Sequence, residues 1–335
     1  MIEKEIIEEP KFTYIDLFCG IGGSHLGLEA NGGKCLFASD IDEHCQKVYE
    51  ANFGIKPYGN IRDEKVLENI PEKFDLLMST NPCQSFSVNG KQKGFEDTRG
   101  TLFFDVFSII EKHQPKVAFF ENVNNLEKHD GGKTLKIIIE ALQNLGYNVS
   151  YKVLNASNFG LPTERKRIFI VASKNGKFNF DLVEENKEKV TIRQFLNKDE
   201  EFKYLKKDDY EFFPYDESKI GKGTILCGRR RCIRKSDNKV ITSRHQQDRI
   251  HSVDGTLETL CAGEQQGRHW IYFPENGGYV RNLTLNECYK IMGFPNNFKK
   301  DSIRSYAYKQ IGNTVAVPII NAICKQIIEQ NLLSD

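Results

Sequence analysis

One cysteine stands in a sequence context suited to nucleophilic chemistry. Cys83 follows the apolar stretch 74–79 and lies between Pro82 and Gln84, with serines and glycines after it. Pro82 fixes the backbone directly before the thiol. A thiol at a strand end, in a loop of small residues, is positioned for attack once its proton is lost. We therefore expect Cys83 to act as a nucleophile rather than as an inert apolar residue.

An acid and two arginines accompany this thiol. Glu121 ends an expected strand at 117–120, and Arg165 and Arg167 precede another at 168–172. A carboxyl group can bind a ring nitrogen and an exocyclic amine together, and a guanidinium can bind a carbonyl oxygen. These residue types fit a planar heterocyclic substrate, although a strand-end cap and a surface charge cluster would have the same composition. A peptidase is disfavoured, because none of the seven histidines has the context of a catalytic base.

A glycine turn provides the second candidate site. The string DLFCGIGG at 16–23 follows a strand-like run and opens a helix-like one. His25 stands where the dinucleotide fingerprint GxGxxG needs its third glycine, which disfavours a pyrophosphate-binding loop. Asp40 follows the second expected strand, where an acid can bind a ribose hydroxyl. We expect a nucleoside cofactor without a pyrophosphate; a plain turn with a helix-capping Asp is the alternative.

The elements that must position these residues alternate along the first 175 positions. Strands are expected at 12–18, 35–39, 74–79, 117–120, 147–154 and 168–172. Helices are expected at 26–30, 43–52, 102–113 and 134–145, with Asp42 as an N-cap and Gly146 as a C-terminal cap. This alternation predicts an α/β fold with a mostly parallel sheet covered on both faces. Ligands of such sheets bind beyond the carboxyl ends of the strands, where the candidate residues fall.

The pattern changes after about residue 175. Short β-like pieces lie at 256–260 and 270–273, and helices return at 285–292 and 318–331. Ten basic and four acidic residues lie between 216 and 250, in a chain whose net charge is +1. We expect a second, smaller, mostly β or irregular domain. Its basic stretch suits a polyanion, although a solvated loop would show the same charge.

Composition excludes several classes of protein. A length of 335 residues suits about two domains, and 39% hydrophobic with 28% charged residues excludes disordered, collagen-like and coiled-coil chains. The nine cysteines include no CxxC pair, so we expect no metal site and the reduced thiols of a cytoplasmic protein. No apolar run approaches the roughly 20 residues that cross a bilayer, and the acidic N-terminus differs from a secretory signal, so we expect no membrane partner.

Together these motifs resemble the cytosine-5 DNA methyltransferase family of the bacterial restriction-modification type. Pro-Cys-Gln and Glu-Asn-Val at this separation, with the glycine turn, form the most specific part of the match. The matching strings are DLFCGIGG (16–23), VYEANFG (48–54), NPCQSFS (81–87), GKQKGFEDTRGTLFFD (90–105), ENV (121–123), LPTERKRIF (161–169), LTLNECYKIMGFP (283–295) and QIGNTVAVP (310–318). The chain departs from the family pattern at Ile41, Asn60, Thr163 and Asn286.

The resemblance implies a mechanism. Cys83 would add to C6 of a cytosine flipped out of the duplex, while Glu121 holds N3 and the exocyclic amine and supplies a proton at N3. Arg165, supported by Arg167, would steady the intermediate. C5 would then take the methyl group of S-adenosyl-L-methionine, and loss of the C5 proton with elimination of Cys83 would release 5-methylcytosine.

The resemblance also implies binding residues, domains and partners. The implied cofactor residues are Phe18, Gly20, Gly22, Gly23, Asp40, Ile41, Asn60, Ile61, Pro82, Leu102 and Asn313. The candidates for contact with DNA are Ser85, Ser87, Asn89, Arg229, Arg230, Arg231, Gln246, Gln247, Arg249, Thr259 and Leu260. A Rossmann-like catalytic domain would comprise 1–185 and 305–335, and a target-recognition domain with a hinge helix would comprise 186–304. The expected protein is a monomer that acts on double-stranded DNA, with any cognate endonuclease acting separately.

Three other functions share part of this pattern. A transfer-RNA cytosine-5 methyltransferase of the same architecture would have the same catalytic residues. A catalytically silent DNA-binding protein is opposed by the presence of Cys83, Glu121 and Arg165, and a nicotinamide dehydrogenase is opposed by His25. Label transferred from S-adenosyl-L-methionine to DNA, to RNA or to neither distinguishes the first two from the main hypothesis.

Overall fold

The computed structural model describes residues 9–81, 102–186, 188–197, 201–214, 217–234, 236, 239–263 and 269–334, apart from the side chain of Gln247. The chain forms two compact units. The first comprises Met1–Val153, Arg167–Glu184 and Ile320–Asp335, and the second comprises Leu154–Lys166 and Glu185–Ile319.

These units differ in two places from the domains expected from the sequence. Residues 154–166 belong to the second unit, where β6 (Thr163–Glu164) pairs with β13 (Leu257–Glu258). Residues 305–319 also belong to it, because α8 (Arg304–Asn313) packs against α7 (Leu285–Ile291). The assignment of catalysis to one unit and of DNA recognition to the other remains a proposal.

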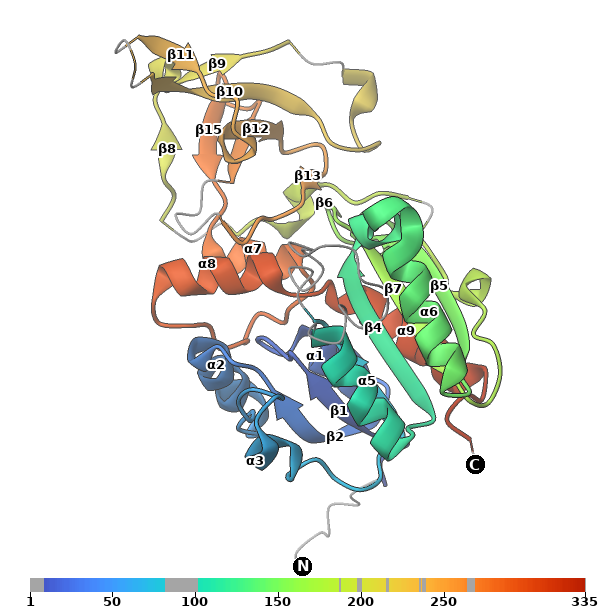
Figure 1. Cartoon of the computed structure of the whole chain (residues 1–335). Coiled ribbons are helices and arrows are strands. Elements are labelled where there is room, and N and C mark those ends of the chain that lie inside the picture. The colour runs from blue at the N-terminus through green and yellow to red at the C-terminus, as the bar shows by residue number, and fades with distance from the viewer. Residues whose placement is uncertain are drawn as a thin grey trace, which may run out of the picture. The chain divides into compact units, whose positions relative to one another are not determined.

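The first unit contains a six-stranded sheet with the order β2-β1-β3-β4-β7-β5 (Figure 1). Its strands are β1 (Phe12–Leu17), β2 (Gly33–Ser39), β3 (Leu76–Ser79), β4 (Val117–Val123), β5 (Asn148–Asn155) and β7 (Lys166–Ser173). The first four are parallel where they pair, and β7 runs antiparallel to β4. This confirms the predicted α/β fold with a mostly parallel sheet. The candidate residues after β1, β2, β3 and β4 therefore follow the carboxyl ends of neighbouring parallel strands.

Helices cover both faces of this sheet. They are α1 (Gly23–Glu29), α2 (Glu43–Phe53), α3 (Glu64–Leu67), α5 (Leu102–His113), α6 (Lys133–Asn144) and α9 (Val317–Glu329). Figure 1 shows α5 and α6 in front of the sheet and α9 behind it. On one face, Phe103 and Ile110 of α5 and Ile138 of α6 share a core with the strands. On α1, Gly27 allows a close approach of α9, because a Cβ there would lie 2.7 Å from Ile320.

Local signals predicted several of these boundaries. Asp42 caps α2 by accepting hydrogen bonds from the amides of His44 and Cys45, and the helix ends at Gly54, whose φ is 69°. Gly146, with φ 88°, follows the end of α6 as expected. Short 3₁₀ helices connect other elements: η2 (Asn124–Glu127), η3 (His129–Gly132), η4 (Ala156–Asn158), η5 (Phe180–Leu182), η6 (Ile192–Phe195), η7 (Lys207–Asp209), η8 (Glu217–Lys219) and η9 (Gln246–Asp248).

The second unit is built on a seven-stranded sheet. Its strands are β8 (Tyr204–Leu205), β9 (Tyr210–Phe212), β10 (Leu226–Ile233), β11 (Val240–Thr242), β12 (Arg249–Ser252), β14 (Trp270–Phe273) and β15 (Tyr279–Asn282). A small core of Tyr210, Ile250, Trp270 and Val280 holds it together. The sequence predicts β14 at 270–273, but its pattern indicates neither β10 nor α8. Three consecutive arginines in β10 hide the alternation that marks a strand.

The apolar stretch Arg304–Glu329 bears on the expectation of no membrane partner. Among the described residues, Arg304–Glu329 is the one stretch long and apolar enough to cross a bilayer, which the sequence analysis did not anticipate. It consists of α8 and α9 with a break at residues 314–316, and half of its most apolar window is buried in the protein. Core helices of this length pass the same test, so the stretch is weak support for a membrane span.

Candidate active site

The glycine turn between β1 and α1 has a backbone that only particular residues can adopt. Phe18, Gly20 and Gly22 have φ angles of 58°, 53° and 88°, in the left-handed region. A Cβ on Gly22 would lie 2.2 Å from the ring of Phe53, whereas a Cβ on Gly20 would meet nothing within 4 Å. Gly22 is therefore required by packing, and the open side of Gly20 leaves the backbone accessible to a ligand.

Asp40 ties this turn to the end of β2. Its Oδ2 accepts a hydrogen bond from the Gly20 amide at 2.9 Å, and its Oδ1 accepts one from the Asp42 amide at 2.8 Å. The next residue, Ile41, is 74% exposed, so apolar surface lies beside the carboxylate. A nucleoside fits this combination, because its ribose presents hydroxyl groups and its base presents an apolar face.

The structure places the other predicted cofactor residues at different depths. The backbone of Tyr58 pairs with Ser39 at the end of β2, and this brings the exposed Asn60 to the same edge of the sheet. The side chain of Ile61 is buried in the core, so a contact of Ile61 with a ligand would have to be made by its backbone. Leu102 begins α5, and Asn313 ends α8 in the second unit.

A buried polar network beneath the turn was missed from the sequence. Asp16 is fully buried, and its Oδ2 accepts a hydrogen bond from Ser24 Oγ at 2.6 Å. Burial raises the pKa of Asp16 to about 7, and the negative charge of Asp40 adds to this rise. His25 Nδ1 lies 2.6 Å from the Tyr49 hydroxyl, and burial lowers the pKa of His25 to about 4, so its ring is neutral. The sequence signal that could have revealed this network is Asp16 itself, because it is an acidic residue inside the apolar run at 12–18.

Glu121 and Arg167 form an ion pair at the end of β4. Glu121 lies near the carboxyl end of β4, and Arg167 lies in the antiparallel β7, paired in register with Val123. Arg167 Nε lies 3.2 Å from Glu121 Oε1, and both side chains are mostly buried. A guanidinium at this distance from a largely buried carboxylate restricts the orientation of the acid.

A second contact joins this end of β4 to the end of β3. Asn122 Nδ2 donates a hydrogen bond to the carbonyl of Asn81 at 3.0 Å. Asn81 is buried, and its own amide group has no hydrogen-bond partner among the described residues. Asn81 is also the last described residue before Cys83 in the chain. The residue that follows the acid is therefore hydrogen-bonded to the start of the cysteine segment, while Pro82, Cys83, Ser85, Ser87 and Asn89 themselves lie outside the described residues.

Arg165 has a different environment from Arg167. Its side chain is almost fully buried in the second unit. Its guanidinium donates hydrogen bonds to the carbonyls of Leu260 at 3.3 Å, Gly312 at 3.1 Å and Thr314 at 2.6 Å. The family resemblance implies a leading role at the substrate for Arg165 and a supporting one for Arg167. Among the described residues, Arg167 contacts the acid and Arg165 donates to backbone carbonyls, and which of the two meets the substrate remains a proposal.

Comparison with known proteins identifies the family. The family model described as C-5 cytosine-specific DNA methylase matches residues 12–329. The chain belongs to this family. It is 40% identical to the type II methyltransferase M.HpaII of Haemophilus parainfluenzae, across 96% of this chain and 90% of that protein. It is 36% identical to M.HhaI of Haemophilus parahaemolyticus, across 98% and 97% of the two chains.

Solved structures agree on the fold. The Dnmt2 methyltransferase of S. pombe has a TM-score of 0.69 at 20% identity and covers 96% of this chain and all of its own. A putative DNA modification methyltransferase encoded within a prophage of E. coli has a TM-score of 0.67 at 19% identity, across 96% and 99% of the chains. This C-5 cytosine-specific DNA methylase therefore transfers a methyl group from S-adenosyl-L-methionine to C5 of cytosine in DNA.

The methylase has a residue set that fits S-adenosyl-L-methionine. The accessible backbone at Gly20, the carboxylate of Asp40 and the exposed Ile41 provide polar and apolar contacts for an adenosine without a pyrophosphate. Asp40 and the turn are already joined by a hydrogen bond, so the site is formed before a ligand binds. When bound, the cofactor supplies the electrophilic methyl group on its sulfonium.

The predicted DNA-binding residues of the methylase are divided between surface and interior. Arg231 is exposed and donates to the carbonyl of Asp208 at 3.4 Å, while Arg229 donates to that of Ser243 at 3.3 Å. Arg230 instead lies 5.3 Å over the ring of the core residue Trp270. Gln246 is exposed, and the side chain of Gln247 lies outside the description.

Thr259 and Leu260 are built into the interior of the second unit. Thr259 Oγ1 donates to the carbonyl of Glu164 at 2.9 Å, and Leu260 is 1% exposed. These contacts leave the side chain of Leu260 no surface for a base. Arg249, by contrast, pairs with Glu258 at the edge of a pocket of about 190 Å³. Burial lowers the pKa of His251 in that pocket to about 3, so the pocket is lined by a neutral histidine.

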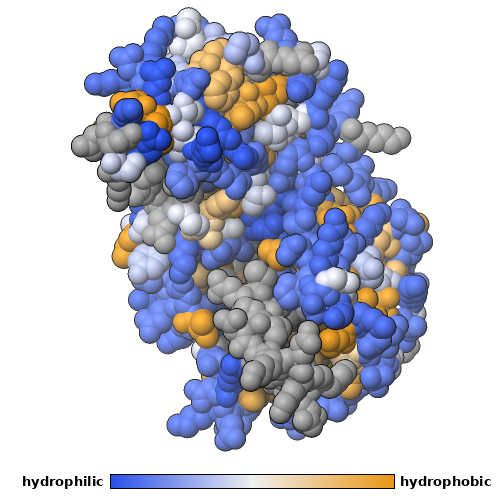
Figure 2. Space-filling view, turned by 45° about the horizontal axis from the view of Figure 1, so that its top comes forward, coloured by the Kyte–Doolittle hydropathy of each residue, from blue (hydrophilic) through white to orange (hydrophobic). Residues whose placement is uncertain are grey.

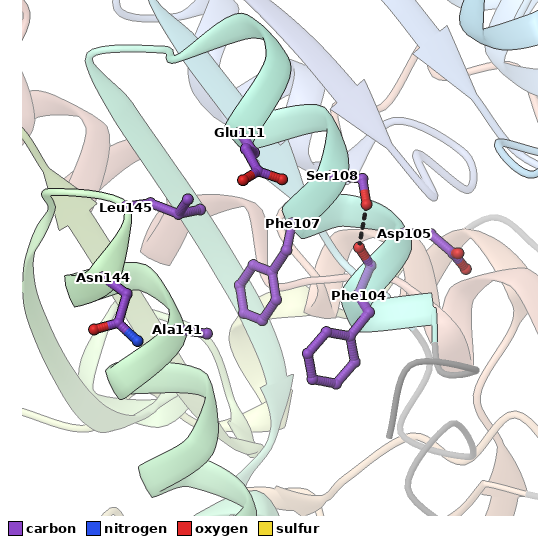
Figure 3. A pocket seen from close by; sticks show the side chains of 8 residues that line it. All are labelled: Phe104, Asp105, Phe107, Ser108, Glu111, Ala141, Asn144 and Leu145. Atoms are coloured by element: carbon purple, nitrogen blue, oxygen red, sulfur yellow. Dashed lines mark hydrogen bonds between the residues drawn. The ribbon is translucent and has the colours of Figure 1, made fainter. Parts of the chain in front are cut away.

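A second pocket lies between α5 and α6 in the first unit. It has a volume of about 520 Å³, and Figure 3 shows Phe104 and Phe107 from α5 and Leu145 beyond α6 around it. Ser108 Oγ donates to the carbonyl of Phe104 at 3.1 Å at its wall (Figure 3). Its lining includes none of the predicted catalytic or cofactor residues, so the pocket is separate from the candidate active site.

Proposed function

We propose that this methylase modifies one cytosine in a specific double-stranded DNA sequence, by covalent catalysis with Cys83 as the nucleophile. The Glu121–Arg167 pair, tied through Asn122 and Asn81 to the start of the cysteine segment, is the observation that carries the proposal. It provides an oriented acid at the strand edge where the described chain ends at Asn81, two residues before Cys83 in the sequence. Unstacking the cytosine costs a few kcal/mol, and contacts within the site must repay it.

Each proposed residue has one task in this reaction. The Cys83 thiolate forms a bond to C6, and Glu121 delivers a proton to N3, so that the added electron pair is held at C5. C5 then takes the methyl group and gives its own proton to a water molecule. The electron pair of the broken C5–H bond restores the C5=C6 double bond, the pair of the Cys83–C6 bond leaves with the sulfur as thiolate, and N3 returns its proton to Glu121. Arg167 keeps the carboxyl group of Glu121 facing the base throughout. Arg165 maintains the fold around residues 260 and 312–314.

A mechanism-based trap tests this proposal. Duplexes containing 5-fluorocytosine cannot lose the substituent at C5, so we expect a covalent protein–DNA complex that survives denaturation and maps to Cys83. Cys83→Ser should give no such complex while it still binds DNA. Absence of the complex in the wild-type protein, or its mapping to another residue, contradicts the proposal. Transfer of label to transfer RNA instead of DNA would exclude DNA as the substrate.

We infer further that the enzyme is a monomer in the cytoplasm and protects host DNA from a separately acting endonuclease. The named similarity to type II methyltransferases supports this inference. Plasmid from cells expressing the enzyme should resist the endonucleases whose sites contain its methylated sequence. Digestion of that plasmid to the same extent as unmethylated plasmid argues against a protective role, and a dimer in sedimentation argues against the monomer.

A further inference from the structure

The β10–β11 hairpin of the second unit presents an apolar pair to solvent. Ile233 and Val240 are directly opposite each other in the antiparallel pairing, and each is 66% exposed. Opposite side chains in such a pair lie close enough to touch, at about 5 Å between Cβ atoms. Figure 1 shows β11 at the end of the second unit opposite α7 and α8, and apolar side chains stand among hydrophilic ones in Figure 2.

The same face of the hairpin continues into arginines. Alternation along β10 places Arg229, Arg231 and Ile233 on one face, and Arg230 on the other. Arg230 lies over Trp270 of the core, so the face with Ile233 points away from that core. Arg229 is paired in register with Arg249 of β12, which extends the positive row across the sheet. Arg229, Arg231 and Arg249 thus form a basic strip, and the apolar pair Ile233 and Val240 lies at its end.

Charge identifies the partner that this strip suits. Residues 226–244 contain seven basic residues and one acid. Two acids lie along the strip: Glu211 of β9 is opposite Arg229 and accepts a hydrogen bond from Thr242, and Glu258 pairs with Arg249. A second copy of the chain would bring two such positive hairpins together, which is unfavourable. A nucleic-acid backbone carries the opposite charge at the required density.

The shape of the element agrees with this partner. A two-stranded ribbon fits the major groove of B-DNA, which is about 12 Å wide. The distinctive apolar group in that groove is the C5-methyl of thymine, and aliphatic side chains contact it without hydrogen bonds. An aliphatic pair between phosphate-binding arginines has the composition for this contact.

We propose that the β10–β11 hairpin enters the major groove of the DNA substrate and places Ile233 and Val240 against thymine methyl groups, while Arg231 contacts the phosphates. The inference rests on the proposed function, because it requires double-stranded DNA as the substrate. It adds a sequence preference for thymine that none of the proposed catalytic residues provides.

Deoxyuridine provides a direct test, since it lacks only the methyl group of thymine. The duplex contains the methylated sequence of the wild-type enzyme, found by bisulfite sequencing, and every thymine around it is replaced by deoxyuridine in the second substrate. We expect the wild type to bind the thymine duplex about fourfold more tightly for each methyl group buried. The double variant Ile233→Ser/Val240→Ser removes every side-chain methyl group at the two positions and should bind both duplexes equally, at the weaker level.

Salt dependence and a matched control complete the test. The double variant removes no charge, so the slope of log K against log salt should equal that of the wild type. Ile303→Ser, at another apolar position of the second unit that is 48% exposed, should behave as the wild type.

Four results would overturn the proposal: equal binding of the two duplexes by the wild type, discrimination retained by the double variant, a changed salt slope, or a wild-type dimer that the double variant abolishes. A wild type that methylates no DNA would instead refute the proposed function.

Discussion

Arg165 and Arg167 are separated by one residue, yet they have different partners. Arg167 lies in β7 and reaches Glu121 of the adjacent β4, whereas Arg165 precedes β7 and bonds to carbonyls far along the chain. The difference follows from strand pairing, because β7 is antiparallel to β4 and its first residues lie beside the last residues of β4. At the scale of residues, the contacts of the described part of the chain therefore place Arg167 at the acid and Arg165 at backbone carbonyls.

Arg167→Ala tests this division of roles. Loss of the guanidinium frees the carboxyl of Glu121 to rotate, and misplacement of a catalytic group by about 1 Å can cost about 10²-fold in rate. We expect single-turnover methylation to fall by that order while the affinity for S-adenosyl-L-methionine, measured by calorimetry, stays the same. Arg167→Lys keeps the charge and should recover part of the rate. An Arg167→Ala enzyme with wild-type turnover would show that Glu121 needs no such partner.

Asp16 predicts a pH dependence of stability. Its folded pKa of about 7 lies above its usual value of 3.8, mainly because of burial, so the folded chain holds this proton more tightly than the unfolded chain. The penalty for ionising Asp16 is therefore absent below about pH 4, grows as the pH rises, and is complete above about pH 7. It amounts to at most about 4 kcal/mol. Asp16→Asn should remove it, so urea unfolding should show the variant gaining stability over the wild type as pH rises.

Asp75 is the matched control for Asp16, because its pKa is shifted in the opposite direction. Burial alone would raise its pKa, but hydrogen bonds from Thr13 and Lys116 hold the pKa of Asp75 below its usual value. Its contribution is present above about pH 4 and is lost as the pH falls through the lowered pKa. Asp75→Asn should therefore lose stability relative to the wild type at neutral pH. Parallel pH profiles for the two variants would contradict the assignment to individual carboxyl groups.

At the scale of elements, the turn between β1 and α1 packs closely against α2 because Gly22 has no side chain. Gly22→Ala would place a Cβ 2.2 Å from the Phe53 ring at a φ of 88°. Overpacking of this kind costs about 1–3 kcal/mol, and the left-handed backbone adds about 1 kcal/mol. We expect both lower stability in urea and weaker binding of S-adenosyl-L-methionine by calorimetry.

Comparison of Gly20→Ala with Gly22→Ala separates the cost of the left-handed backbone from the cost of the clash with Phe53. Gly20 has a φ of 53°, but a Cβ there meets nothing within 4 Å. The stability loss should be limited to about 1 kcal/mol from the backbone. Cofactor affinity should nevertheless fall, because the new methyl group occupies the open side of the turn. Equal stability losses in the two variants would show that Phe53 moves aside.

Elements with local signals could be predicted, and those without them could not. Helix α5 has its expected bounds, since an apolar run precedes Pro115 and the residue before a proline disfavours helix. Strand β10 was missed because Arg229, Arg230 and Arg231 conceal which face is buried. The roles of Arg165 and Arg167 depend on partners 46 to 149 residues away, and no spacing in the sequence reports such contacts. The family motifs nevertheless pointed to the family, and the acid and the glycine turn that they mark both lie at the carboxyl edge of the parallel strands.

At the scale of the whole molecule, a net charge of +1 conceals a strong asymmetry. The basic residues of 216–250 lie in the second unit, whereas the acid and the glycine turn lie in the first. A nearly neutral protein can thus bind a polyanion through the basic residues of one unit, without a cluster of positive charges in the unit that contains the acid and the glycine turn. Affinity for DNA should consequently depend on salt through residues of the second unit.

Arg231→Gln tests this asymmetry with a matched control. Arg231 is exposed in β10, and each phosphate contact contributes about 0.9 to the slope of log K against log salt. We expect the slope to fall by about 1, with similar loss for specific and non-specific duplexes. Lys136→Gln removes an exposed charge from α6 of the first unit, where Lys136 pairs with Glu140, and should leave the slope unchanged. If both variants shift the slope equally, DNA responds to total charge rather than to the basic strip, and the recognition role of the second unit would need another basis.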